Sequence, residues 1–298
     1  MLKEKYIKMS VLEKQKYIKL IKDKFEKALA KELDLVRVSA PIVVTRESGL
    51  QDDLSGTERA VTFDIAKDGK DLEIVQSLAK WKRMALKKYE FPLHKGLYTD
   101  MTAIRRDDKV DATHSIYVDQ WDWEKVISKE DRTFDYLKKT VRKIVKAIAE
   151  TSDFIKSKGF KGIDISKDVY FITTQQLLDM YPTLTAKERE DKITKHDLRA
   201  PDYDDWSLDG DLLFYHDVLD KALEISSMGI RVDKTSLLSQ IEKADKKERL
   251  SYPFHKAILE DKLPLTIGGG IGQSRLCMLL LGRAHIGEVQ ASYWDKDT

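Results

Sequence analysis

The stretch Thr266–Leu281, TIGGGIGQSRLCMLLL, constrains the fold of this chain more than any other. It holds four of the 14 glycines of the sequence, and an apolar run from Leu276 to Leu281 follows them. Glycine runs allow a backbone to take positive φ or to approach a ligand closely. The leucine spacing predicts a buried helix that begins near Gln273 or Ser274, so a glycine-rich strand runs directly into a helix.

Arg275 falls in the first turn of this predicted helix. Exposed N–H groups at a helix start, an open glycine backbone and a guanidinium together suit a phosphate. A tight turn with a solvated arginine accounts for the same pattern, and this stretch alone leaves both interpretations open. It is not a Walker A loop, because no Gly-Lys-Ser/Thr follows the glycines. It is also a poor dinucleotide fingerprint, because no second βαβ half follows it.

A second informative region is a predicted hairpin between residues 98 and 123. Tyr98–Ile104 is predicted as a short strand that leads to Arg105, and His114–Trp123 alternates with the period of a strand. On the returning arm, Gln120 and Asp122 continue the face of two aliphatic side chains. Such a polar pair indicates a strand that leaves the core for a cleft, although an exposed sheet edge would give the same pattern.

The order of the predicted elements indicates an α+β fold, with a mainly antiparallel sheet flanked by helices. Helices are predicted at 2–33, 78–89, 128–159, 174–180, 185–193 and 234–260, and strands at 35–44, 58–65, 71–75, 169–173, 211–216 and 263–267. Residues 200–206 are predicted as a polar loop, and 218–225 fit a helix slightly better than a strand. Because no long linker is present, 1–298 is predicted as a single domain. The helix and the proline-broken strand in 1–45 are elements that could form a dimer interface.

Composition excludes several classes of function. The net charge of +2, from 53 basic and 51 acidic residues, gives no reason to expect a nucleic-acid partner. Cys277 is the only cysteine and lies in an apolar run, as expected for a core residue in a reducing compartment. The lysine-rich N-terminus does not resemble a signal peptide, and no apolar stretch reaches the ~18 residues that span a bilayer. We therefore expect a cytoplasmic protein without a membrane partner.

Four charged residues suggest nucleotide chemistry. Arg105 and Arg275 are suited to hold two parts of a triphosphate, and Asp211 and Glu224 are suited to hold Mg²⁺ through carboxylate oxygens. Nucleotidyl transfer needs such groups, because they offset the charge on phosphate oxygens at the reacting centre.

These residues lie in segments that resemble a known family. The hairpin with Arg105 and the strand–helix unit with Arg275 are similar to motifs 2 and 3 of class II aminoacyl-tRNA synthetases. The resemblance is stronger to ammonia-dependent asparagine synthetases (aspartate–ammonia ligases) and covers nearly the whole chain. Six runs carry it, in the order of that family: QDDLSG at 51–56, SLAKWKR at 77–83, HSIYVDQWDWEKV at 114–126, RAPDYDDW at 199–206, ISSMGIRVD at 225–233 and TIGGGIGQSRL at 266–276. The chain departs from the family pattern at Arg106 and in shorter segments at 193–199 and 206–211.

The resemblance implies a class II synthetase-like fold, Mg²⁺, a homodimer and a reaction in two steps. The side-chain carboxylate of L-aspartate attacks the α-phosphate of ATP, which gives β-aspartyl-AMP and pyrophosphate. Ammonia then attacks the acyl carbon, which gives L-asparagine and AMP.

The same resemblance implies roles for individual residues. Arg105 would hold the α-phosphate and the carboxylate being activated, and Arg275 would lie at the phosphate or substrate end of the cleft. Asp52 would bind ammonium and take its proton. In the aspartate site, Lys82 would pair with a substrate carboxylate and Asp122 with the α-ammonium. The complete sets are Ser77, Lys82, Gln120 and Asp122 for aspartate; Arg105, Asp204, Asp211, Glu224, Ser227, Arg231 and Arg275 for ATP; and Asp211 and Glu224 for Mg²⁺.

Two other functions remain open. A tRNA-charging aspartyl- or asparaginyl-tRNA synthetase would need a tRNA-binding domain of roughly another hundred residues, for which the sequence after Trp294 leaves no room. A non-catalytic paralogue would bind aspartate or ATP as a sensor, and loss of Arg105, Arg275 or the acid pair would indicate it; all are present. The internal cysteine does not suit a glutaminase, so ammonia is the expected nitrogen donor.

Overall fold

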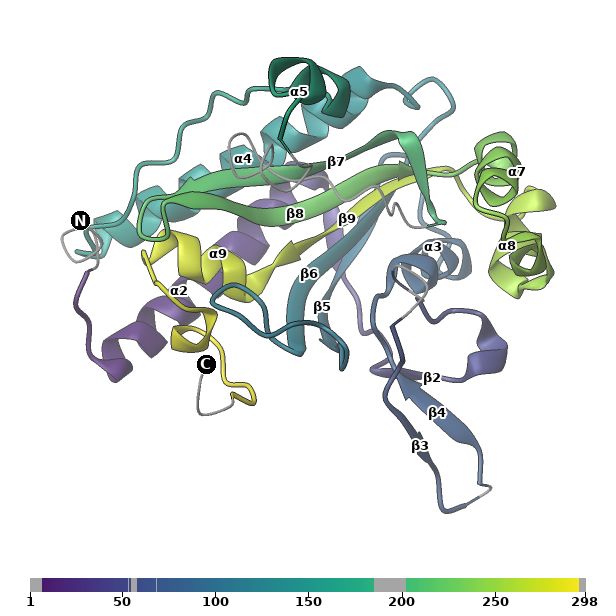
Figure 1. Cartoon of the computed structure of the whole chain (residues 1–298), viewed down its shortest axis with the longest axis horizontal. Coiled ribbons are helices and arrows are strands. Elements are labelled where there is room, and N and C mark those ends of the chain that lie inside the picture. The colour runs from purple at the N-terminus through teal and green to yellow at the C-terminus, as the bar shows by residue number, and fades with distance from the viewer. Residues whose placement is uncertain (1–6, 53, 55–57, 68, 185–201, 295–298) are drawn as a thin grey trace.

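The fold is built on a six-stranded sheet in the computed structural model, which describes residues 7–52, 54, 58–67, 69–184 and 202–294 of the 298 in the chain (Figure 1). The strand order is β1-β5-β6-β9-β8-β7, and a separate sheet has the order β2-β4-β3. The pair β1–β5 is parallel, whereas the other pairs of neighbouring described strands are antiparallel. The predicted α+β class with a mainly antiparallel sheet is confirmed.

The elements follow one another along the chain as hairpins separated by helices. The strands are Leu35–Arg37 (β1), Val43–Val44 (β2), Thr62–Asp64 (β3), Asp71–Ile74 (β4), Gly96–Ile104 (β5), Tyr117–Val126 (β6), Asp204–His216 (β7), Lys221–Arg231 (β8) and Thr266–Gly272 (β9). The α-helices are Val11–Leu33 (α2), Ala79–Lys88 (α3), Phe134–Ser157 (α4), Thr174–Met180 (α5), Lys234–Lys243 (α7), Pro253–Leu259 (α8) and Gln273–Leu280 (α9). Three 3₁₀ helices are Arg46–Ser48 (η1), Lys247–Ser251 (η2) and Ile286–Glu288 (η3).

The main core lies between the large sheet and the long helices α2 and α4 (Figure 1). Trp121 and Trp123 of β6 are buried in it, and the rings of Phe25 and Trp121 pack with centroids 4.7 Å apart. Successive side chains of a strand point to opposite faces. Gln120 and Asp122 therefore point away from this core, as the alternation in the sequence predicted.

The short helices α3, α7 and α8 lie at one end of the large sheet, where the β2-β4-β3 sheet also projects (Figure 1). Arg83 of α3 is buried there and donates to the carbonyl oxygens of Pro264, at 2.9 Å, and Val232, at 2.8 Å. Burial lowers the pKa of Arg83 to about 10. Through these two bonds α3 is fixed to the chain before β9 and after β8, so it holds a constant position beside the sheet.

Three predictions of local structure were wrong. The segment 218–225 does not form a helix, because most of it belongs to β8, which pairs with both β7 and β9. Val218 lies in the turn between β7 and β8, so the spacing that favoured a helix joined residues of two different elements. The polar segment before 206 enters β7 at Asp204, and 169–173 contains no strand. The helix predicted at 185–193 lies outside the described residues. Within the described ranges, no helix has both the length and the apolar character needed to cross a membrane.

The close approach of β8 to β9 generates a prediction about stability. A Cβ on Gly269 would lie 2.6 Å from the Cβ of Met228 and 2.6 Å from the carbonyl oxygen of Ser227. We predict that Gly269→Ala lowers the free energy of unfolding by about 1–3 kcal/mol, the usual cost of overpacking. The measurement is the urea midpoint at an unchanged m value. Gly210→Ala in β7 is the control, because a Cβ there meets nothing within 4 Å. Equal losses in both variants would contradict the steric argument.

Candidate active site

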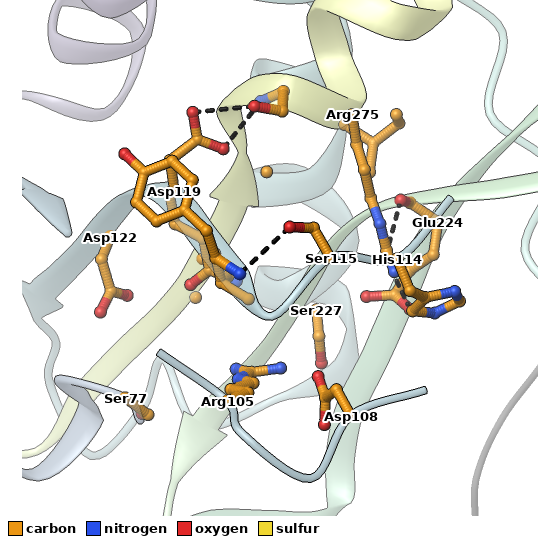
Figure 2. A pocket seen from close by; sticks show the side chains of 18 of the residues that line it. Ser77, Arg105, Asp108, His114, Ser115, Asp119, Asp122, Glu224, Ser227 and Arg275 are labelled. Atoms are coloured by element: carbon orange, nitrogen blue, oxygen red, sulfur yellow. Dashed lines mark hydrogen bonds and ion pairs between the residues drawn. The ribbon is translucent and has the colours of Figure 1, made fainter. Parts of the chain in front are cut away.

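A cavity of about 550 Å³ opens over β6, β8 and β9 (Figure 2). All side chains predicted for the site line it except Asp52 and Asp211. Those that line it are Ser77, Lys82, Arg105, Gln120, Asp122, Asp204, Glu224, Ser227, Arg231 and Arg275. They come from six separate segments of the chain, and the sheet brings them to one cleft.

The glycines of β9 form the floor of the cleft. Gly270 lies opposite Asp122 of β6 on one side and opposite Ser227 of β8 on the other. A Cβ on Gly270 would overlap the side-chain amide of Gln120. Glycine is therefore required here for space, so that polar side chains from both neighbouring strands can lie over the middle one.

The two arginines predicted to hold phosphate enter the cleft from different elements (Figure 2). Arg275, in the first turn of α9, pairs with the Glu224 carboxylate at 3.3 Å and donates to its carbonyl oxygen at 3.2 Å. The Arg105 Nε, at the end of β5, donates to the carbonyl oxygen of Gln76 at 3.3 Å. Each guanidinium is thus oriented by backbone carbonyls and can still donate further bonds to a ligand.

Glu224 reaches the cleft because of an irregularity in β8. Leu212 of β7 pairs with Ser226, but the next residue, Leu213, pairs with Glu224, which leaves Ile225 as an extra residue. Without this bulge, Glu224 and Ser227 would point to opposite faces of the sheet, because their spacing is odd. The bulge places both among the residues that line the cleft.

The start of α9 differs from the phosphate seat that the sequence suggested. The backbone N–H of Ser274 donates to the Asp119 carboxylate at 3.1 Å, and the Ser274 hydroxyl donates to it at 2.9 Å. A carboxylate of the protein therefore occupies the Ser274 N–H, as a capping side chain does. The Arg275 guanidinium, rather than this backbone group, is what the first turn of α9 offers to a ligand.

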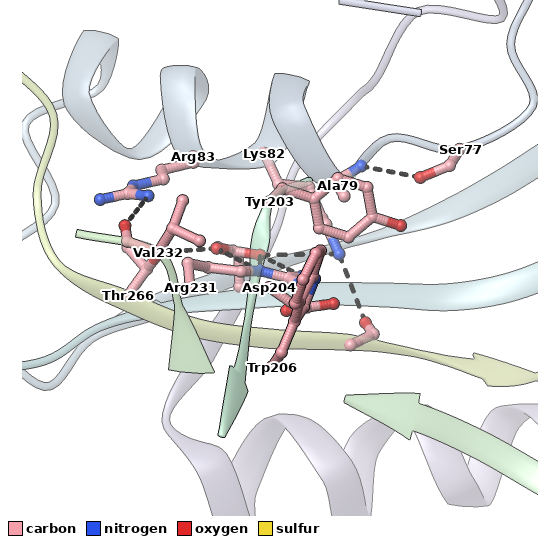
Figure 3. Close-up of polar contacts among 12 residues, drawn as sticks. Ser77, Ala79, Lys82, Arg83, Tyr203, Asp204, Trp206, Arg231, Val232 and Thr266 are labelled. Atoms are coloured by element: carbon pink, nitrogen blue, oxygen red, sulfur yellow. Dashed lines mark hydrogen bonds and ion pairs between the residues drawn. The ribbon is translucent and has the colours of Figure 1, made fainter. Parts of the chain in front are cut away.

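Five buried charges lie close together at the base of the cleft. Figure 3 labels three of them, Lys82, Asp204 and Arg231. Arg231 binds Glu124 at 2.8 Å and Asp204 at 2.5 Å, and Thr266 donates to Glu124 at 2.7 Å. Lys82 pairs with Asp122, and its ammonium also donates to the carbonyl oxygens of Trp123 and Gly269 at 2.9 and 3.3 Å. We call Lys82, Asp122, Glu124, Asp204 and Arg231 the buried charge cluster.

The buried charge cluster has three carboxylates and two cations, so it carries one uncompensated negative charge when all are ionised. Burial opposes ionisation of Glu124, but Arg231 and Lys82 outweigh burial and lower its pKa. Burial raises the pKa of Asp122 despite its contact with Lys82. A ligand ammonium beside Asp122 would offset the excess charge, so the electrostatics of the cleft favour a cationic group at this position.

The prediction that Lys82 pairs with a substrate carboxylate stays a prediction. In the structure its ammonium is buried, and three acceptors of the protein engage it. One of them is the Asp122 carboxylate, so Lys82 holds Asp122 in place.

Asp52 and Asp211 lie just outside the cavity lining. The Asp52 carboxylate accepts the hydroxyl proton of Tyr203 at 3.0 Å, and Tyr203 itself lines the cavity. Burial and the nearby carboxylates of Asp52 and Asp204 raise the pKa of Tyr203, so its hydroxyl stays protonated and donates. Asp211 lies on β7 directly opposite Ser227. Among the described residues, no group of three or more histidine, cysteine, aspartate and glutamate side chains is arranged to hold a metal.

Comparison with known proteins agrees with this geometry. The family model described as aspartate-ammonia ligase matches residues 12–196 and 194–298. The chain is 58% identical to an aspartate–ammonia ligase of Clostridium tetani, over 94% of this chain and 88% of that protein. It is 53% identical to one of Bacillus cereus, over 97% of this chain and 94% of that protein. This chain belongs to the aspartate–ammonia ligase family.

Solved structures show that this member of the ligase family shares its fold with tRNA synthetases. Asparaginyl-tRNA synthetase of Entamoeba histolytica, in complex with asparaginyl-adenylate, matches with a TM-score of 0.67 and 14% identity, over 96% of this chain and 68% of that one. The Pyrococcus horikoshii enzyme, also complexed with asparaginyl-adenylate, matches with a TM-score of 0.63 and 15% identity, over 93% and 68%. The predicted class II synthetase-like fold is thus confirmed.

Three residues of this ligase-family site were missed in the sequence. Glu124 continues the face of Gln120 and Asp122, and a predicted strand longer than His114–Trp123 would have included it. Asp119 lies on the other face of β6 and gave no such signal. Tyr203 lies in the RAPDYDDW run, where only Asp204 was selected.

The buried charge cluster predicts a large effect of removing one cation. Arg231→Met leaves Glu124 and Asp204 without their main partner, so we expect the free energy of unfolding to fall by about 3–5 kcal/mol. The matched control is Arg37→Met, because Arg37 pairs with Asp100 at the surface with 57% of its side chain exposed. Such a pair contributes at most about 1 kcal/mol. Urea unfolding of both variants measures the two losses in the free energy of unfolding. Similar losses would contradict the argument that burial makes the Arg231 pairs more important than the surface pair.

The raised pKa of Asp209 should make the stability of the protein depend on pH. Burial, together with the negative charge of Asp204, raises the pKa of Asp209 to about 7. Because the unfolded chain releases this proton at a lower pH, stability should decline as the pH rises from about 4 to about 7. Asp209→Asn removes this decline, so we expect the variant to exceed the wild type by about 2–4 kcal/mol at pH 8 and to match it near pH 4. A constant difference at both pH values would exclude Asp209 as the cause.

Proposed function

We propose that this chain catalyses the ATP-dependent amidation of the L-aspartate side chain by ammonia, giving L-asparagine, AMP and pyrophosphate. The observation that carries the proposal is the 58% identity to a protein named aspartate–ammonia ligase, over 94% of this chain. The cleft supports it, since Arg105, Arg275, Gln120 and Asp122 all line one cavity.

In the first step, an oxygen of the aspartate side-chain carboxylate attacks the α-phosphorus of ATP, and pyrophosphate leaves with the electrons of the broken P–O bond. Arg105 is proposed to contact both the α-phosphate and the carboxylate, and Arg275 the phosphate end of the same cleft. Two fixed guanidiniums reduce the repulsion between these anions and stabilise the charge that develops on the phosphoryl oxygens.

Glu224 and Asp211 are the proposed ligands of Mg²⁺, an ion that commonly binds one or two carboxylates together with substrate phosphates. Of these two residues, Glu224 lines the cavity and Asp211 does not. The Glu224 side chain lines the cavity and is 43% exposed, so it can offer an oxygen beside Arg275. Asp211 lies across from Ser227 at the neighbouring strand. When bound there, the ion would offset negative charge on the triphosphate.

Aspartate recognition is assigned to Ser77, Gln120 and Asp122. The uncompensated charge of the buried charge cluster favours the α-ammonium of aspartate beside Asp122. Lys82 acts on the substrate through Asp122, which it holds in a fixed orientation. Asp204 and Arg231 belong to the same cluster, and with Ser227 they would form the nucleotide side of the pocket.

In the second step, ammonia attacks the acyl carbon of β-aspartyl-AMP, and AMP leaves. Ammonia must be neutral to act as a nucleophile, so ammonium has to lose a proton first. Asp52 is the proposed acceptor of that proton. Its carboxylate lies behind Tyr203, at the edge of the cavity.

We further propose a homodimer that uses the N-terminal segment 1–45. Support comes from β1, an edge strand of the large sheet, and from the exposed apolar side chains of Val36 and Ile42, which are 52% and 58% exposed. A single domain, a cytoplasmic location and the lack of a nucleic-acid partner stay predictions from the sequence. The non-catalytic alternative is not favoured, because relatives that are 53% and 58% identical over most of this chain are named as the ligase.

The test is to measure L-asparagine and AMP formed from L-aspartate, ATP and Mg²⁺, with either ammonium or glutamine supplied. We expect equal amounts of both products with ammonium only. Arg105→Ala should lower kcat/KM about 100- to 1000-fold, the range for losing one group that stabilises transition-state charge. Arg142→Ala, on α4 outside the cavity, is the control and should retain the wild-type rate.

Two outcomes would contradict this proposal. Aspartate-dependent exchange of pyrophosphate into ATP without asparagine would mean that aspartate is activated for another acceptor. A folded protein that neither forms asparagine nor exchanges pyrophosphate into ATP would favour the non-catalytic sensor.

A further inference from the structure

Several hydrogen bonds hold the segment 49–52, which we call the Asp52 loop, in place. The side chain of Gln51 donates to the carbonyl oxygen of Ile74 at 2.9 Å and accepts the backbone N–H of Gln76 at 3.0 Å. The side chain of Gln76 in turn donates to the backbone carbonyl of Asp52 at 3.0 Å. These bonds attach the loop to the segment after β4, but they do not reach the helices on its other side.

A buried lysine makes that second attachment. Lys80 belongs to α3 and is 2% exposed, which is rare for a lysine. Its ammonium donates to the carbonyl oxygen of Gln51 at 3.2 Å and lies 3.6 Å from the Asp202 carboxylate. Lys80 thus connects the residue before Asp52 to a buried acid that the proposed reaction does not use.

Asp202 is held in turn by the helical segment 247–259. Arg249 of η2 binds its carboxylate at 2.7 Å, and the fully buried His255 of α8 lies 3.2 Å from the same oxygen. Burial opposes ionisation of Asp202, but His255, Lys80 and Arg249 outweigh it and lower the pKa. Asp202 is therefore ionised at neutral pH and can orient the Lys80 ammonium.

Two further contacts join the same partners. Tyr203 directly follows Asp202 and donates its hydroxyl to the Asp52 carboxylate at 3.0 Å. Gly49, at φ +65°, packs against α8, since a Cβ on it would lie 3.0 Å from the Pro253 side chain and 3.4 Å from Tyr252. The Asp52 loop is therefore clamped between the segment after β4 and the start of α8.

We propose that Lys80 and Asp202 are positioning residues for the ammonia step: together they fix the backbone of Gln51, and hence the Asp52 carboxylate, relative to the cleft. The inference rests on the proposed function, in which Asp52 takes the proton of ammonium. Proton transfer needs donor and acceptor at hydrogen-bond distance, and a displacement of about 1 Å can cost roughly 100-fold in rate.

Adenylation does not use Asp52. Arg105 is oriented by the Gln76 carbonyl, and Gln76 is bonded to the Gln51 side chain. Gln76 stays bonded in this way when the Lys80 ammonium is removed, so adenylation should change little.

The experiment compares two half-reactions in Lys80→Met, a substitution that keeps the length of the side chain and removes the ammonium. One assay follows asparagine formation against ammonium concentration at saturating aspartate and ATP. The other follows aspartate-dependent exchange of pyrophosphate into ATP, which reports adenylation alone. We expect kcat/KM for ammonium to fall by roughly 10- to 100-fold, while exchange stays within about twofold of the wild type.

Lys125→Met is the matched control. Lys125 of β6 is also buried and donates its ammonium to a backbone carbonyl, that of Leu33 at 2.9 Å, but it does not line the cavity. Both half-reactions should be unchanged in this variant. If Lys80→Met lowers both half-reactions by the same factor, its role is structural and the proposal is wrong.

A second variant covers the possibility that Lys80→Met does not fold because Asp202 loses a partner. Lys80→Met/Asp202→Asn removes both charges, while the asparagine keeps an acceptor for Arg249. We expect it to fold and still to show the ammonium defect, because the Gln51 carbonyl still lacks its donor. Recovery of the wild-type kcat/KM for ammonium would overturn the proposal. Failure of the wild type itself to form asparagine would instead reject the proposed function.

Discussion

The buried ion pairs of Arg231 with Glu124 and Asp204 are the interaction on which the rest of the site depends. They connect β8, β6 and the start of β7 below the cleft, and Lys82 adds α3 through Asp122 and Glu124. Buried charges are costly unless each has a partner, so these side chains have few alternative arrangements. The cluster thereby fixes the position of α3 relative to the sheet and holds the Asp122 and Asp204 carboxylates at the lining of the cleft.

The glycines of β9 make this arrangement possible. A larger side chain at Gly268 would overlap the Glu124 carboxylate and lie 2.6 Å from the Arg231 guanidinium. The glycines of this strand thus provide room for long polar residues from both of its neighbours. The same strand continues into α9, which is oriented by Asp119 and carries Arg275. The floor of the cleft and the Arg275 side chain are therefore built on a single continuous segment, Thr266–Leu280.

Patterns of short range allowed much of this site to be predicted from the sequence. Alternation along β6 predicted correctly that Gln120 and Asp122 face away from the core. The leucine spacing after the glycines correctly predicted the helix that carries Arg275. Features that depend on partners distant in the sequence could not be predicted. The bulge at Ile225 is visible only in the pairing of β7 with β8, so no periodicity could assign Glu224 to the cleft face. Likewise, the bulge shifts the alternation of β8 by one residue, so its period could not be read from the sequence.

Lys82 shows a second limit of sequence reasoning. A lysine in a predicted substrate site suggests a free cation, but its environment decides how many of its protons remain available. Three protein acceptors surround this ammonium, and two of them are backbone carbonyls that carry no signal in the sequence. The family resemblance identified the residue as part of the site, whereas only the structure shows what it contacts.

The pairing of β6 with β9 has a consequence for how the protein is made. Gln120 faces Gly272, so the floor of the cleft joins segments that are 152 positions apart in the sequence. Contacts of such long sequence separation form late, because the intervening chain must first be ordered. During synthesis, the hairpin of β5 and β6 leaves the ribosome with one edge unpaired, and that edge stays open to other strands until β9 emerges. The cleft is thus completed only after β9 has been translated.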